Sequence, residues 1–94
     1  SSISATSRIR DDGVLIYTIT GQLFFGTMSH FIDLFAYDQG PKKIEIDFSN
    51  SHIWDQSAVM GIARVIDRFQ LNGSSVYVTG LNEESQTTLD KGFS

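Results

Sequence analysis

The sequence predicts a small α/β sandwich, in which about three helices pack mainly on one face of a mixed β-sheet. Strand-like and helix-like runs alternate in the second half of the chain, which favours parallel strands joined by crossover helices. Near the N-terminus, Asp12-Gly13 separates two strand-like runs and predicts an antiparallel hairpin. The length of 94 residues fits one small domain.

Composition excludes several classes of protein. The seven Lys and Arg residues are scattered through a chain of net charge −4, so no basic patch for nucleic acid is expected. The chain has no cysteine, which excludes disulfides, zinc sites built on thiolates and cysteine nucleophiles. No apolar run approaches the ~18 residues of a membrane span, so we expect no direct membrane insertion by these residues.

The first half of the chain is expected to begin with a linker, or the boundary of a domain cut from a longer chain, over the Ser-rich residues 1–7. Residues 8–94 are then a single domain, and residues 8–20 form its hairpin. Residues 21–26, GQLFFG, predict a short, well-buried extended segment because two phenylalanines lie between glycines. Residues 27–38 predict a helix, which Gly40-Pro41 ends. Its apolar face has the spacing i, i+3, i+4, i+7 and consists of Met28, Phe31, Ile32 and Phe35.

The second half contains two strands and two helices. Residues 42–49 alternate apolar and charged side chains and predict a strand. Residues 55–73 predict the longest helix, with Asn72-Gly73 at its end. Residues 74–80 are a β-branched run, and residues 82–91 open with Asn82, a typical N-cap. The expected buried stripe of the longest helix is Val59, Ile62, Ala63 and Ile66.

The junction between the third strand and the longest helix carries the candidate chemistry. Asp55, Gln56 and Ser57 lie there, and Asp55 suits the N-cap position. A helix of 100° per residue turns Ser57 away from the buried stripe, towards solvent, among unpaired N–H groups that would donate hydrogen bonds to a phosphate. Two interpretations stay open, a plain capped helix start and a modified serine. The residues expected on the same side as Ser57 are Met60, Gly61, Arg64 and Arg68.

Catalytic, metal and nucleotide sites are not predicted. A triad of Ser57, His52 and Asp55 lacks the nucleophile-elbow pattern around the serine. Both histidines are isolated from any metal-ligand spacing, and no Gly-rich phosphate loop is present. We therefore expect no enzyme activity, no metal, no cofactor and no nucleotide binding.

The stretch of residues 44–82 resembles the STAS domain family, in which an apolar strand runs into a D-x-S-A/G-V segment at a helix start. The flanking hairpin and last helix fit the same fold. In one branch of the family, free-standing antagonists of anti-sigma factors, a kinase phosphorylates the serine that Ser57 matches. Gln56 and Ala58 depart from the family's common Asp-Ser/Thr-Ser-Gly pattern, in which a hydroxyl residue and a glycine occupy these positions, and this weakens the prediction of a phosphorylation switch.

The other branch is the cytosolic domain of SulP anion permeases, whose Gly-x-Leu-Phe-Phe segment residues 21–26 resemble. The resemblance implies a regulatory domain of a sulfate-type transporter at the cytoplasmic face of the cell membrane. Its partners would be the transmembrane part of the same transporter and other cytosolic proteins. The implied regulatory loop is Asp55, Gln56 and Ser57, and the implied partner surface is Trp54, Met60, Gly61 and Arg64. Trp54 is either a contact anchor or a core-edge residue packed under the loop.

Overall fold

The first two strands form the hairpin that Asp12-Gly13 predicts. In the computed structural model, which describes residues 2–92, β1 (Ile3–Ile9) pairs antiparallel with β2 (Leu15–Leu23). Gly13 has a φ of +89° and donates its N–H to the Arg10 carbonyl at 2.9 Å, which closes the turn. The expected linker over residues 1–7 is wrong for residues 3–7, which lie in β1; residue 1 lies outside the described part. A polar, Ser-rich composition suits an edge strand with one solvated face.

The remaining strands are parallel to β2. β3 (Lys43–Ile53) pairs with β2, and β4 (Ser75–Thr79) pairs with β3, so the strand order follows the sequence. Each parallel connection passes through a helix, as parallel pairing requires. The mixed sheet predicted from the sequence is therefore confirmed.

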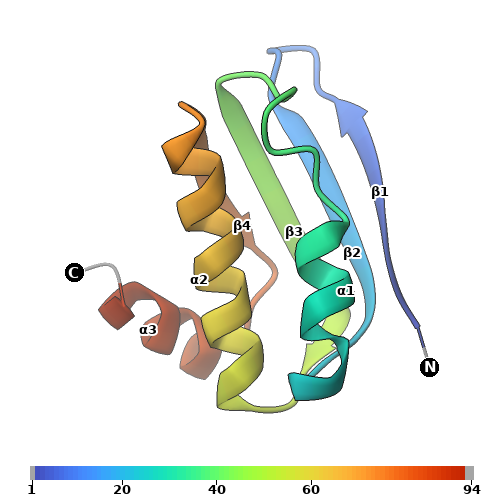
Figure 1. Ribbon diagram of the computed structural model, residues 1–94, viewed down its shortest axis with the longest axis vertical. Helices are drawn as coiled ribbons and strands as arrows, with labels where there is room; N and C mark the ends of the chain where they lie inside the picture. The colour runs from blue at the N-terminus through green and yellow to red at the C-terminus, as the bar shows by residue number, and fades with distance from the viewer. Residues whose placement is uncertain (1, 93–94) are drawn as a thin grey trace.

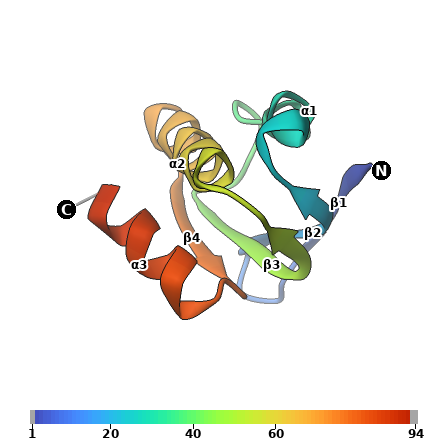
Figure 2. The ribbon, with the colours of Figure 1, turned by 90° about the horizontal axis from the view of Figure 1, so that it is seen from below.

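The helices form the second layer. After a short 3-10 helix η1 (Phe25–Thr27), α1 (Met28–Asp33) and α2 (Gln56–Leu71) lie on one face of the sheet. The last helix, α3 (Glu83–Gly92), lies beside α2 next to β4 (Figures 1 and 2). The predicted domain ends at residue 94, and its residues 93–94 lie outside the described part of the chain. The predicted three helices, mainly on one face, match this arrangement.

The core lies between α1, α2 and the sheet. Ile44, Ile46 and Phe48 alternate along β3 and are almost fully buried under the helices. Tyr17 of β2 meets Phe35 edge to face at 4.8 Å between ring centroids, and Phe35 packs against Phe69 of α2 at 5.7 Å. These rings fix the helices on the sheet and so position the starts of α1 and α2.

Two predictions about residues 21–38 are wrong in detail. Gly21–Leu23 is the end of β2, not a separate buried segment, and both Phe24 and Phe25 are exposed. The predicted helix over 27–38 ends at Asp33. Two hydrogen bonds satisfy carbonyl groups of the last turn in place of α-helical bonds. Leu34 N donates to Phe31 O at 3.1 Å, and Tyr37 Oη donates to Ile32 O at 2.6 Å.

Candidate functional site

Asp55 joins the two loops at one end of the sheet. It is the N-cap of α2, as predicted, and its Oδ1 accepts a hydrogen bond from Ala58 N at 3.0 Å. Its Oδ2 accepts a second hydrogen bond, from Phe25 N at 3.1 Å. One carboxylate therefore ties the start of α2 to the segment between β2 and α1, 30 residues earlier in the chain.

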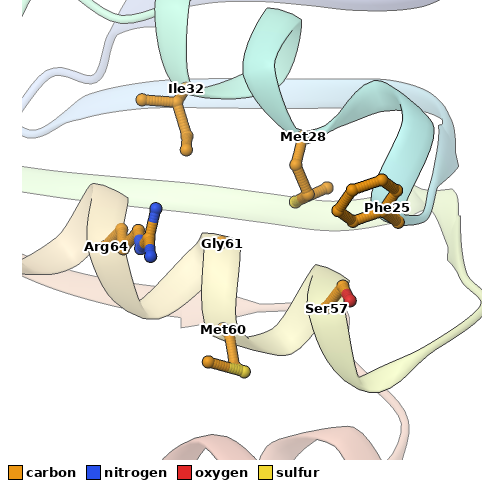
Figure 3. A pocket seen from close by; sticks show the side chains of 7 residues that line it. All are labelled: Phe25, Met28, Ile32, Ser57, Met60, Gly61 and Arg64. Atoms are coloured by element: carbon orange, nitrogen blue, oxygen red, sulfur yellow. The ribbon is translucent and has the colours of Figure 1, made fainter.

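Ser57 lies in the first turn of α2 and is half-buried, so the prediction that it faces solvent is only partly met. Its side chain lies across an open space from Phe25 of the 3-10 helix (Figure 3). Gln56, beside it, is exposed. In residues 2–92 no hydrogen bond joins Ser57 to His52 or Asp55, and both Asp55 oxygens bind backbone N–H groups. The geometry therefore does not assemble a catalytic triad.

A groove runs between α1 and α2 from this junction, and we call it the α1–α2 groove. It has a volume of about 230 Å³. Figure 3 shows Met28 and Ile32 reaching from α1 towards α2, while Arg64 extends from α2 towards α1. The walls are mostly apolar, and Arg64 supplies a positive charge. The full lining is Phe25, Met28, Ile32, Ser57, Met60, Gly61 and Arg64.

Gly61 has a different role from the one predicted. It is buried rather than presented at the surface, and a Cβ placed on it would overlap Sδ of Met28. The missing side chain lets α1 approach α2 and forms the floor of the groove. Met60 is exposed and lines the groove on its α2 side.

Trp54 is exposed over 63% of its surface, so its interpretation as a core-edge residue is wrong. Its ring packs at a tilt against the ring of His52, with the two centroids 4.4 Å apart, and its Nε1 donates a hydrogen bond to Oε1 of Gln22. These contacts hold an apolar ring in solvent at the end of β3. Such a ring is a suitable contact anchor.

Most exposed large apolar side chains lie at this one end of the molecule. Phe25 is exposed over 77% of its surface. We call the set the apolar end surface, and it consists of Phe24, Phe25, Trp54 and Met60. Large exposed apolar side chains gathered at one place are typical of a binding surface.

Sequence reasoning missed the α1 side of the groove. Phe25 was expected inside the protein, and Met28 and Ile32 were assigned only to a core-facing stripe. The i, i+4 spacing of Met28 and Ile32 puts them on one face of α1, which the groove partly exposes. Nothing in the sequence distinguishes a fully covered apolar face from a partly covered one.

Two other kinds of site are absent from residues 2–92. No group of His, Asp and Glu side chains is arranged to hold a metal ion. Within the same residues, every helix is too short or too polar to span a membrane.

The family model described as the STAS domain matches residues 6–92. The chain belongs to the STAS domain family. Its fold is similar to that of an anti-sigma-factor antagonist STAS domain from Rhodobacter sphaeroides, with a TM-score of 0.81 and 33% identity over 93% of this chain and 96% of that one.

Transporters also contain STAS domains similar to this one. It is 25% identical over 95% of its length to the Bacillus subtilis protein named "Putative sulfate transporter YbaR", of which it spans only 19%. The murine anion transporter Slc26a9 shares the fold, with a TM-score of 0.71 at 12% identity over 97% of this chain and 18% of that one. The recognised family and its α/β fold are thus confirmed, and both branches of the family are represented.

Proposed function

We propose that this STAS domain is the regulatory, protein-binding domain of a SulP-like transporter of sulfate or another inorganic anion. The observation that carries the proposal is the apolar end surface beside the α1–α2 groove. Phe25 and Trp54 are exposed, so they lower the solubility of the isolated domain and do not contribute to its core. A partner that covers both side chains would explain why they are there. Asp55, Gln56 and Ser57 are then the regulatory loop, and no catalytic residue is involved.

The transmembrane part of the same transporter is the partner that fits this surface. Similarity to the sulfate transporter relative supports that choice. The start of β1 lies at the same end of the molecule as the starts of α1 and α2 (Figure 1). A membrane part joined before residue 1 would therefore meet the domain at the apolar end surface, at the cytoplasmic face of the membrane.

The groove also indicates what the partner presents. Met28 and Ile32 offer apolar walls, and Arg64 offers a cation in a chain of net charge −4. An amphipathic segment with one acidic side chain would match both features, because the acid can pair with Arg64 while apolar side chains fill the groove. Such a segment can come from the transporter itself or from another cytosolic protein.

A second function is favoured by a separate observation. The Rhodobacter sphaeroides domain is an anti-sigma-factor antagonist and matches at 33% identity over nearly its whole length. Ser57 lies in the first turn of α2, where N–H groups can bind a phosphate. A phosphate there would put negative charge at the mouth of the α1–α2 groove, across from Phe25. A phosphorylation switch at Ser57 would act in this way.

Site-specific cross-linking separates the two functions. A photoreactive phenylalanine replaces Met60 in the native-length protein, expressed in its own host, and the matched control replaces Leu71. Leu71 is also exposed, but it lies at the opposite end of α2. The transporter function predicts a cross-link from position 60 to a membrane-spanning segment of the same polypeptide and none from position 71.

Other results would overturn the proposal. A cross-link from position 60 to a separate anti-sigma kinase, with phosphate on Ser57, would establish the antagonist function instead. Equal cross-linking from positions 60 and 71 would show that the apolar end surface is not the docking site. Sulfate uptake unchanged by Met60→Glu would show that the docking does not regulate transport.

A further inference from the structure

The free edge of β1 is open for pairing. In the strand order β1-β2-β3-β4, β1 is an outer strand, and within residues 2–92 no helix lies beyond it, whereas α3 lies beside β4 (Figures 1 and 2). Its seven residues pair with β2 in an unbroken register and include no proline and no bulge. Prolines, bulges and charged side chains are the features that keep native edge strands from pairing with other chains, and β1 has only the single charge of Arg8.

The hairpin fixes which backbone groups point outwards. Arg10 N donates to Val14 O at 2.8 Å, so Arg10 and Val14 are a hydrogen-bonded pair. Hydrogen-bonded and non-hydrogen-bonded pairs alternate along an antiparallel ladder. The N–H and C=O groups of Arg8, Thr6 and Ser4 therefore face β2. Those of the alternate residues face away from the sheet, and these residues are Ile3, Ala5, Ser7 and Ile9.

We propose that two copies of this chain pair through β1, antiparallel, about a two-fold axis at Thr6. In this register Thr6 lies opposite Thr6 and Ser7 opposite Ala5, so all four outward residues of each strand find hydrogen-bond partners. Ile9 of one copy lies opposite Ile3 of the other, and Arg8 lies opposite Ser4. The two four-stranded sheets become one continuous sheet.

A second copy fits this edge better than an unrelated strand. The sequence of β1, ISATSRI, is nearly symmetric about Thr6 in apolar and polar character. The register puts no like charges opposite each other, because Arg8 is the only charged residue in the strand. It also covers Ile9, which is exposed over 69% of its surface in the single copy. An isologous contact of this kind closes as a dimer.

Cysteine cross-linking tests both the contact and its register, because the chain has no cysteine of its own. Thr6→Cys places two thiols opposite each other in a non-hydrogen-bonded pair, whose Cα atoms lie roughly 4.5 Å apart, within disulfide range. Mild oxidation should convert most of this variant to a covalent dimer. Ser4→Cys and Arg8→Cys are matched controls on the same exposed face. Each alone should remain monomeric under oxidation, whereas an equal mixture of the two should form the heterodimer.

Light scattering coupled to size exclusion tests the unmodified chain. We expect the fraction of dimer to rise with concentration, and Ser7→Pro to abolish it, because proline removes an outward N–H that β2 does not use. A thermal melt of Ser7→Pro checks that the monomer remains folded, and Ile9→Lys serves as a second disrupting variant if it does not. A monomer at every concentration, or oxidation yields equal for Thr6→Cys and Ser4→Cys, would overturn the proposal.

Discussion

The carboxylate of Asp55 binds Ala58 N in α2 and Phe25 N in the 3-10 helix. Replacing an N-cap aspartate by alanine costs about 0.5–2 kcal/mol. We therefore expect Asp55→Ala to lower the free energy of unfolding by about 1–2 kcal/mol, measured by urea denaturation. The same change should speed amide hydrogen exchange at Phe25, because that N–H loses its acceptor.

Asp55→Asn is the matched control for this carboxylate. The amide keeps one oxygen for Ala58 N but presents an NH₂ group to Phe25 N, so α2 should keep its cap while the link to the 3-10 helix is lost. Stability should fall less than in Asp55→Ala, while exchange at Phe25 rises as much. If exchange at Phe25 is unchanged in both variants, Asp55 does not join the two loops.

Gly61 sets how closely α1 approaches α2. Alanine there gains about 1 kcal/mol of helix propensity but crowds Met28, and overpacking costs about 1–3 kcal/mol. We expect Gly61→Ala to destabilise the domain by about 1 kcal/mol, since the crowding outweighs the propensity. In a Met28→Ala background the same change should be stabilising. A double-mutant cycle of urea unfolding measures this, and the same sign in both backgrounds would contradict the packing argument.

The hairpin element has its own electrostatic support. The Arg10 guanidinium donates to both oxygens of Asp12, at 2.9 and 2.6 Å, and to Glu45 of β3 at 3.2 Å. The hydrogen bond from Arg10 lowers the pKa of Asp12 from 3.8 to about 2, with a smaller contribution from Val14 N. The contact between Arg10 and Glu45 therefore links the hairpin turn to β3.

This pKa gives a pH dependence with a definite sign. Because the folded pKa of Asp12 lies below its unfolded value, its contribution is complete above about pH 4 and is lost as the pH falls towards 2. We expect the melting temperature to fall less steeply between pH 4 and 2 in Asp12→Asn than in the unchanged chain. Asp11→Asn removes the same charge from the same turn. If both variants flatten the profile equally, general charge rather than the pair with Arg10 is responsible.

The strands and helices that could be predicted were those whose apolar residues recur at a regular spacing. The alternation in residues 42–49 and the apolar stripe of α2 determined a strand and a helix, although the stripe also includes Ala58, Val65 and Phe69. β3 continues to Ile53 because Leu23 of β2 pairs with Ile53. That extension depends on a neighbouring strand, which residues 50–53 do not reveal.

Across the whole molecule, the fold was predictable and the surface was not. The order of elements specified a mixed sheet with helices, and Asp55 was correctly expected at the N-cap of a helix. The exposure of Phe25 and Trp54 depends on what packs across the ends of β2 and β3, which is a property of the assembled fold. The α1–α2 groove similarly depends on how closely Gly61 lets the helices approach.

Net charge and the apolar end surface together determine how the whole molecule behaves near its isoelectric point. The chain has a pI of about 4.8, and near that pH self-repulsion disappears while the exposed Phe25 and Met60 remain. We expect light scattering of the chain to be greatest near pH 4.8. The double variant Phe25→Ser/Met60→Ser should reduce it several-fold, because the apolar contacts between molecules are lost. Leu71→Ser, which removes an isolated exposed leucine from the opposite end, should leave it nearly unchanged. An equal reduction in light scattering in both variants would mean that the apolar end surface promotes association no more than the rest of the domain does.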